Sequence, residues 1–359
     1  MKRIFAIVLC ICMALTIVAC GPKEAEYKLG MGVVVSMDSS KTGNAQVDAT
    51  VATVVTDADG KIVLCRIDVA QNKMAVANGA VDTAATFKTK MELGDAYGMA
   101  PVKIDNDGNG VTKEWYEQAK AFESYVVGKT VAEVEAIKTQ EKNGHLIAVD
   151  QALLDAGCSM QITDFIAAVA KACKDDQGTT FTAVADSFTL GVAAKTTAAE
   201  STAAVADNAE TEENEAKDGS VKMYTDFAAS VVADGKIIAT LNDAIQPQIG
   251  VNAAGEITTK TFQATKRELK EGYNMAKFGA NLDNNGDGKV LEWYVQSAEF
   301  SKFVTGKTAA EVAGMKTVAA TQGSVGYMIS ADEALLAAGC TIQIADICAV
   351  VAQSATNAR

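Results

Sequence analysis

The chain has 359 residues, which predicts two domains of ordinary size, and its composition, 49% hydrophobic with only three prolines, excludes a fibrous or largely disordered protein. The formal charge of -13 argues against a nucleic acid partner, because an acidic chain repels phosphate backbones. His145 is the single histidine, which excludes zinc or haem sites built on histidine ligands.

The start of the chain has the order of a secretory leader. A basic pair precedes an apolar run over residues 4–18 that is short for a membrane-spanning helix. The run ends in Val-Ala-Cys-Gly, which resembles a bacterial lipobox. This resemblance implies a signal peptide at 1–19, palmitate or other acyl chains on Cys20 and a tether at 20–26, which would anchor the protein to the cell membrane, facing outside the cytoplasm. A plain signal peptide with an incidental cysteine is the alternative.

The rest of the chain carries one long pattern twice. Its order is Thr-Lys, Glu-Leu, Tyr-x-Met, an Asp/Asn/Gly loop, Glu-Trp-Tyr and Gly-Lys-Thr, at 89–130 and again at 265–308. Conserved order over this length predicts a tandem duplication, with copy one at 27–175 and copy two at 176–359. An acidic stretch at 196–219 falls inside copy two, where it predicts a disordered loop between two strands.

Each copy is expected to begin with strands and to end with helices. Apolar alternation predicts strands at 29–37, 46–55 and 61–69, matched by 190–194, 224–232 and 236–241. Helical spacing and capping boxes predict helices at 112–127, 151–156 and 163–173, matched by 333–338 and 345–353, with caps at Thr130 and Glu133, Thr308 and Glu311, and Ser330 and Glu333. The order predicts an α+β fold of two homologous domains, each an antiparallel meander or hairpin followed by packed helices.

Five cysteines remain outside the leader and the lipobox. They are Cys65, Cys158, Cys173, Cys340 and Cys348. An odd number at irregular spacing is a poor disulfide framework, so we expect buried free thiols.

The two Asp/Asn/Gly loops resemble the first half of an EF-hand calcium loop. The oxygen-bearing residues are Asp105, Asp107 and Asn109 in copy one, and Asp283, Asn285 and Asp287 in copy two. An EF-hand also needs a bidentate carboxylate at position 12, where both copies have tyrosine. A weak calcium site is one interpretation, and a tight Asx-rich turn ahead of a helix is the other.

Aromatic and basic residues of the repeated pattern are candidates for ligand contacts. Rings stack well on flat ligands, although apolar packing in the core explains them equally. The lysines are the basic groups expected to meet a phosphate or a carboxylate, with solvated surface lysines as the alternative. The candidates are Thr89, Lys90, Tyr97 and Trp115 in copy one, and Thr265, Lys266, Tyr273 and Trp293 in copy two.

A Gly-Cys-Ser or Gly-Cys-Thr element precedes the last helix of each copy. Together with the Asp-Gly-Lys-Ile turns at 59–62 and 234–237, it looks like the FMN-binding domain of bacterial surface lipoproteins. The resemblance implies FMN as the cofactor, and it implies FMN attachment through a phosphoester to the hydroxyls beside the two cysteines. The residues concerned are Ser159 with Cys158, and Thr341 with Cys340. Cysteine replaces the alanine of the family motif, so noncovalent FMN or loss of the cofactor stays open.

The resemblance implies a lipid-anchored extracytoplasmic flavin-binding protein with an electron-carrier role and an undefined redox or surface partner. A surface lipoprotein without redox activity, binding a small ligand or a protein, is the alternative. A hydrolase or transferase is less favoured, since no nucleophile stands at a catalytic spacing from a base.

Overall fold

The computed structural model describes residues 23–100, 108, 110, 112–208, 210, 215–278, 283–322 and 326–359. Cys20 and the predicted leader lie outside these ranges, as do Asp105, Asp107 and Asn109. Antiparallel sheets and packed helices make the fold α+β, as the sequence predicts.

The sheet of copy one is an antiparallel meander with one added strand. It consists of β1 (Glu24–Ser36), β2 (Asn44–Thr56), β3 (Ile62–Ala75) and β6 (Thr179–Val184), in the order β3-β2-β1-β6. The three meander strands confirm the predicted ones. The sequence did not predict β6, which lies beyond the predicted boundary at 175, in residues assigned to copy two, and yet pairs with β1 of copy one.

Copy two repeats the meander and adds a smaller sheet. Its strands β7 (Thr189–Thr197), β9 (Tyr224–Ala233) and β10 (Lys236–Ile245) have the order β10-β9-β7, and β12 (Ile257–Thr261), β11 (Gln248–Val251) and β8 (Gly219–Lys222) form a separate sheet. Part of the acidic stretch is ordered, because Thr202 bridges to Ser220 and Val205 bridges to Lys217. The disorder predicted for the stretch is wrong for these residues, since backbone pairing holds them beside the strand β8.

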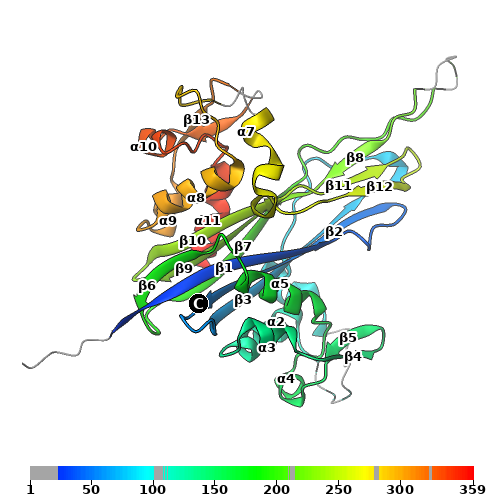
Figure 1. Ribbon diagram of the computed structural model, residues 1–359. Coiled ribbons are helices and arrows are strands. Elements are labelled where there is room, and N and C mark those ends of the chain that lie inside the picture. The colour runs from blue at the N-terminus through cyan, green and yellow to red at the C-terminus, as the bar shows by residue number, and fades with distance from the viewer. Residues whose placement is uncertain are drawn as a thin grey trace, which may run out of the picture.

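The two meander sheets pack face to face and share one apolar core. Alternate residues of β1 and β2, such as Leu29 and Val51, belong to the same buried cluster as residues of β7 and β9, such as Leu190 and Phe227. Because strand side chains alternate between faces, the other set of residues in each sheet points outward. Helices cover those outer faces, so that the molecule has the layers helix, sheet, sheet, helix (Figure 1).

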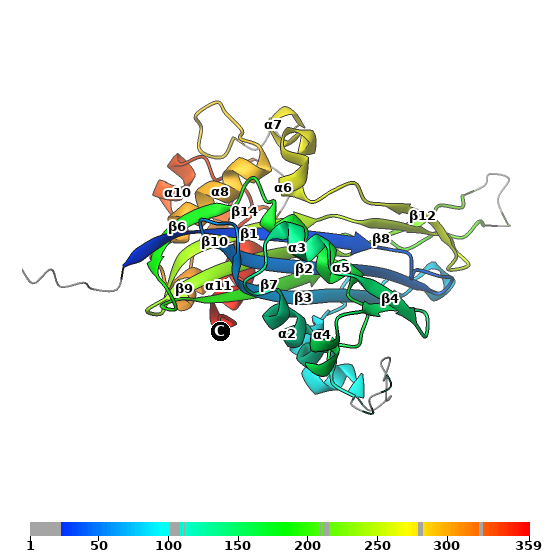
Figure 2. The same cartoon turned by 60° about the horizontal axis from the view of Figure 1, so that its bottom comes forward.

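Long helices lie across the outer face of each sheet (Figure 2). In copy one, α5 (Thr163–Cys173) packs on β1 and β2, and α2 (Trp115–Val126) packs on β3. In copy two, α11 (Ala345–Thr356) packs on β7 and β9, and α8 (Trp293–Val304) packs on β10. The helices predicted from apolar spacing are therefore confirmed.

Short elements connect the main layers. Copy one has η1 (Ala77–Gly79), α1 (Lys90–Leu93), η2 (Gly94–Tyr97), α3 (Val131–Glu135), β4 (Thr139–Lys142), β5 (His145–Ala148) and α4 (Gln151–Asp155). Copy two has α6 (Lys266–Leu269), η4 (Lys270–Tyr273), α7 (Met275–Phe278), α9 (Ala309–Ala313), β13 (Thr317–Ala319), β14 (Met328–Ser330) and α10 (Glu333–Ala337). One predicted cap is wrong: Asp332, not Ser330, caps α10, because its carboxylate accepts the N–H of Ala334.

Glycine in the first strand of each copy lets the last helix approach the sheet. A Cβ atom at Gly30 would lie 2.0 Å from the carbonyl oxygen of Ala172, and one at Gly191 would lie 1.9 Å from that of Ser354. Real Cβ atoms do not come so close, so any side chain at either glycine would push α5 or α11 off its sheet.

Candidate functional site

The Thr-Lys segment of each copy begins a short helix through a capping box. Thr265 accepts the N–H of Glu268 at 3.2 Å, and the Glu268 carboxylate accepts the N–H of Thr265 at 3.1 Å. Thr89 and Glu92 make the same pair of bonds. Both threonines are buried, so the fold itself uses the two side chains that the sequence proposed as cofactor contacts.

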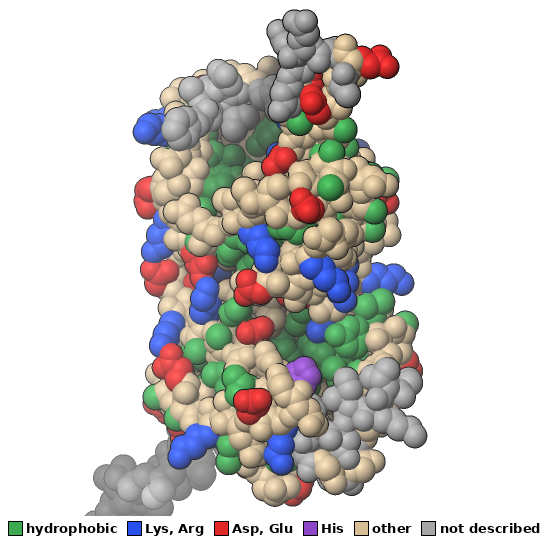
Figure 3. Space-filling view, turned by 90° about the vertical axis from the view of Figure 1, so that its right-hand side faces the viewer, with side chains coloured by type: hydrophobic (Ala, Val, Ile, Leu, Met, Phe, Trp, Pro, Cys, Tyr) green, Lys and Arg blue, Asp and Glu red, His purple; other side chains and the backbone are tan. Residues whose placement is uncertain are grey.

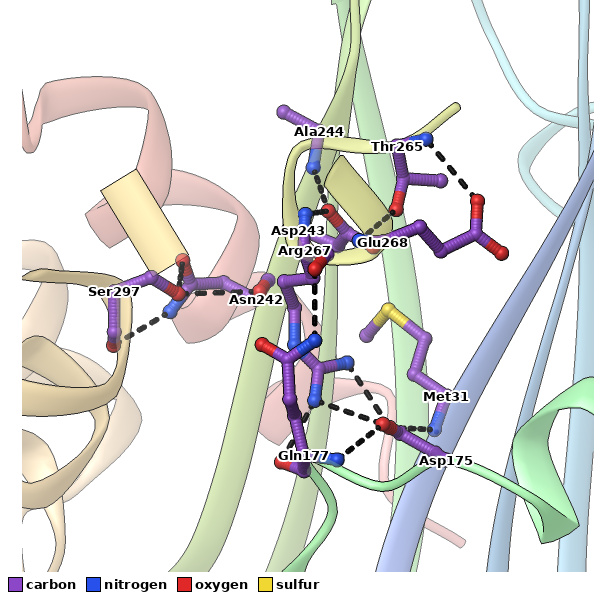
Figure 4. Close-up of polar contacts among 10 residues, drawn as sticks. All are labelled: Met31, Asp175, Gln177, Asn242, Asp243, Ala244, Thr265, Arg267, Glu268 and Ser297. Atoms are coloured by element: carbon purple, nitrogen blue, oxygen red, sulfur yellow. Dashed lines mark hydrogen bonds and ion pairs between the residues drawn. The ribbon is translucent and has the colours of Figure 1, made fainter. Parts of the chain in front are cut away.

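A buried aspartate in the third meander strand holds each capping box against the sheet. Asp243 accepts the N–H of Arg267 at 3.0 Å and that of Ala244 at 2.8 Å, as Figure 4 shows. Asp68 plays the same part in copy one. Burial raises the pKa of Asp68 to about 7 and that of Asp243 to about 6. Sequence reasoning missed both, although a lone carboxylate within an apolar strand was a usable signal.

Lysine, tyrosine and tryptophan of the repeated pattern come together in both copies. In the Lys90 cluster, the Nζ atom lies 4.8 Å from the ring centroid of Tyr97 and 5.4 Å from that of Trp115. In the Lys266 cluster, it lies 5.0 Å from Tyr273 and 5.1 Å from Trp293. Rings at this range attract the ammonium group. The structure thus brings together candidates that stand about 25 residues apart in the sequence.

Two further residues of the pattern hold this arrangement in place. The Glu292 carboxylate accepts the N–H groups of Met275 and Ala276 at 2.9 and 3.1 Å, which fixes the segment after Tyr273. Glu114 does the same in copy one. The glutamate of each Glu-Trp-Tyr sequence therefore fixes the backbone that follows the tyrosine, next to the tryptophan ring that faces the lysine.

The Gly-Cys-Ser and Gly-Cys-Thr elements are buried beneath a glutamine. The Gln118 Oε1 atom accepts the N–H of Ser159 at 3.0 Å, and the Gln296 Oε1 atom accepts that of Thr341 at 2.7 Å. The two hydroxyl residues are only 4% and 3% exposed. A phosphoester at either hydroxyl would first require the element to leave this position, so covalent FMN attachment stays a prediction.

The described cysteines are all free thiols, as predicted, and all of them except the half-buried Cys173 are buried. Cys158 and Cys340 lie fully inside the cores beneath the helices. Burial raises the pKa of each to about 12, because the thiolate would lose its hydration there. Neither thiol is suited to act as a nucleophile.

A cavity of about 280 Å³ opens beside the Lys266 cluster, and we call it the Trp293 cavity. Aromatic, aliphatic and charged side chains of β9, β10, α6, α8 and α11 meet in its wall. The lining includes Tyr224, Asp226, Ala244, Ile245, Gln246, Lys266, Tyr273, Met275, Trp293, Tyr327, Ile342, Gln343, Asp346 and Ile347. Sequence reasoning found Lys266, Tyr273, Met275 and Trp293 and missed the others, which come from strands and loops far from the repeated pattern.

Copy one has larger side chains at the corresponding positions. Val69 follows Asp68 as Ala244 follows Asp243, and Phe165 stands in α5 where Ile347 stands in α11. The Phe165 ring lies 5.8 Å from that of Trp115, edge to face. His145 replaces Tyr327 and lies at the surface, where it is the one purple side chain in Figure 3. The Lys90 cluster therefore lies beside bulkier side chains than the Lys266 cluster does.

The loop of the copy-two calcium prediction is bonded to its own backbone. Asp283 accepts the N–H groups of Gly286 and Gly288 at 2.9 and 3.0 Å, and Asp287 accepts that of Lys289 at 2.8 Å. Asn285 donates to the carbonyl of Leu336. These are the contacts of an Asx-rich turn. Within the described ranges no group of three or more metal-ligating side chains gathers, and calcium stays a prediction.

A buried ion pair joins the two copies near α6. The Arg267 guanidinium meets the Asp175 carboxylate at 3.0 and 3.2 Å and donates to the Gln177 carbonyl at 2.7 Å (Figure 4). Asp175 also accepts the N–H of Met31 in β1. In copy one, Met91 takes the position of Arg267, so this link exists on one side of the molecule.

Comparisons with known proteins gave one partial similarity. The chain is 38% identical over 100 residues to a chlorophenol reductase of Desulfitobacterium hafniense, a match that covers 24% of this chain and 28% of that protein. No family model and no solved structure matches. Among the described helices, none is both long and apolar enough to cross a membrane.

Proposed function

We propose that the protein is a lipid-anchored, extracytoplasmic binding protein that holds a small ligand in the Trp293 cavity. The observation that carries the proposal is the gathering of Tyr224, Tyr273, Trp293 and Tyr327 with a lysine around one opening. Ligand sites are concave and place polar groups that set orientation beside apolar walls, and the Trp293 cavity combines both kinds of side chain. Anchoring rests on the predicted lipobox at Cys20.

An FMN-binding electron carrier is the second candidate. Four rings in one wall favour a flat partner, and the redox chemistry would be supplied by the flavin, so no catalytic acid or base is required. The partial match to a protein named as a reductase is compatible with this role. The cavity volume of about 280 Å³ falls just below the usual range of about 300–1,000 Å³, which favours a small ligand over a whole flavin nucleotide.

The chain offers a built-in probe, because its two tryptophans are divided between the copies. Trp115→Phe leaves Trp293 as the only emitter, and Trp293→Phe leaves Trp115. We expect a ligand to change the emission of Trp293 alone. Lys266→Ala should weaken binding about tenfold, as expected for the loss of one charged contact, while the matched variant Lys90→Ala should leave it unchanged.

The first experiment is native mass spectrometry of the anchored protein from its own host, followed by titration of the Trp115→Phe protein with FMN. A co-purifying small molecule, or quenching of Trp293 by FMN, would support a binding role and separate the two candidates. Absence of any bound molecule, together with a Trp293 emission that no metabolite extract or FMN changes, would refute the proposal.

A further inference from the structure

The cavity wall holds a carboxylate with no partner among the described residues. Asp226 lies in β9 on the face that points to the helices, since Phe227 faces the shared core and Ala228 the helices. Its side chain is half-buried and lines the Trp293 cavity. None of the hydrogen bonds or ion pairs of the described residues reaches its carboxylate, whose oxygens keep contact with solvent at the cavity and are open to a ligand.

A cation without an ion pair faces the same cavity. Lys266 lines the opening, and its contacts within the described ranges are with the rings of Tyr273 and Trp293. The neighbouring charges are already neutralised: Asp346 pairs with Lys195 at 2.7 Å, and Glu200 pairs with Lys222 at 3.7 Å. The Asp226 carboxylate and the Lys266 ammonium group are therefore available to pair with the charges of a ligand in the cavity.

Copy one does not repeat this charge pattern. Thr50 lies opposite Val69 at the register position where Asp226 lies opposite Ala244. The nearby Asp48 accepts two bonds from the Gln46 side chain, at 2.7 and 3.0 Å. Copy one therefore has no carboxylate at the position of Asp226, and the carboxylate that Lys90 influences there is Asp164 in α5.

We propose that the Trp293 cavity binds a small zwitterion of the α-amino acid type with an apolar side chain. This inference rests on the proposed binding function and names its ligand class. The ligand ammonium would meet Asp226, its carboxylate would meet Lys266, and its side chain would lie against the aromatic wall. Charge-assisted hydrogen bonds at both ends would reject molecules that carry only one of the two groups, since one buried charge would then stay unpaired.

Protonation of Asp226 should control the affinity. Burial raises the pKa of Asp226 to about 6; Lys266 and Lys195 oppose the shift, and Asp346 and Asp243 add to it. A protonated Asp226 cannot pair with an ammonium group. Amino acid binding should therefore weaken as the pH falls through about 6, and Asp226→Asn should remove that dependence.

The test uses L-phenylalanine and its two half-molecules, phenethylamine and 3-phenylpropionate, titrated into the Trp115→Phe protein with calorimetry as a second readout. We expect phenylalanine to bind at least about tenfold more tightly than either half-molecule. Asp226→Asn should lower the affinity for phenylalanine about tenfold and spare phenylpropionate. Lys266→Met should lower it equally and spare phenethylamine, and Lys90→Met should change nothing.

Equal affinity for all three molecules would overturn the inference, as would an Asp226→Asn protein that is folded by circular dichroism and binds phenylalanine normally. Failure of phenylalanine, leucine and alanine to bind, with FMN or a host metabolite still quenching Trp293, would reject the zwitterion and leave the binding function standing. If no compound changes the emission of Trp293 and no small molecule co-purifies with the protein, both the zwitterion proposal and the proposed binding function are refuted.

Discussion

The Lys90 and Lys266 clusters have the same lysine, tyrosine and tryptophan in the same geometry, yet their surroundings differ. Around Lys90, Val69 and Phe165 complete a packed core. Around Lys266, Ala244 and Ile347 leave a cavity with an unpartnered carboxylate. The repeated pattern thus builds a scaffold common to both copies, and a few side chains outside it decide whether the scaffold has room for a ligand.

The largest loss of stability is expected when the arginine of the ion pair between the copies is replaced by the residue that copy one has at the same position. Arg267→Met introduces the residue that copy one has, and it leaves Asp175 buried without its cation. The free energy of unfolding should fall by about 3–5 kcal/mol, measured by urea denaturation. The double variant Arg267→Met with Asp175→Asn should recover part of the loss. An unchanged midpoint for the single variant would contradict a structural role for the pair.

Removing side-chain volume beside Trp115 in copy one should lower the stability by a smaller amount. Val69→Ala with Phe165→Ile removes buried volume beside Trp115 and should lower the free energy of unfolding by about 2–4 kcal/mol. Addition of the copy-two ligand to the Trp293→Phe form of this protein then tests whether the space itself is sufficient. Without a carboxylate at position 50, we expect the emission of Trp115 to stay constant; a ligand-dependent change would show that space alone decides.

Closing copy two is the reverse change. Ala244→Val with Ile347→Phe fills the Trp293 cavity with the side chains of copy one and should weaken ligand binding at least about tenfold, or about 1.4 kcal/mol. Stability should hold or rise, because the cavity is replaced by packed atoms. Calorimetric titration and a urea midpoint separate the two effects. Retained binding would place the ligand elsewhere.

The smallest contrast concerns the two buried aspartates. A carboxyl whose folded-state pKa is raised binds its proton more tightly in the folded state, so stability falls as the pH rises from about 4 through that pKa. The decline should extend to about pH 7 for Asp68 and to about pH 6 for Asp243. The urea midpoint measured between pH 4 and 8 should depend less on pH in the Asp68→Asn protein than in the Asp243→Asn protein. Equal pH dependence in the two variants would reject the predicted difference between the two pKa values.

The local elements could be predicted from the sequence because their signals are local. Apolar alternation located the six meander strands, and helical spacing located α5 to the residue. The packing of one sheet on the other could not be predicted, because the inner residues of both sheets are equally apolar and the sequence of one sheet does not specify which surface it packs against.

The candidate site divides in the same way. Lys266, Tyr273 and Trp293 were found because they belong to a pattern repeated in order. Asp226 and Tyr327 were not found. Asp226 reaches the cavity through its register position in β9, and Tyr327 reaches it from a loop about 100 residues further along the chain. Gln118 and Gln296, which accept the backbone N–H groups of the buried Ser159 and Thr341, were not among the predicted site residues.

The shared apolar core has a consequence for how the two copies can change over time. Leu29 and Val51 are covered by Leu190 and Phe227, so deletion of either copy would expose a sheet face to water. A copy that has no ligand of its own is still under selection as the other half of that core. Substitutions on the inner face of copy one should therefore destabilise copy two as well, whether or not copy one binds a ligand of its own.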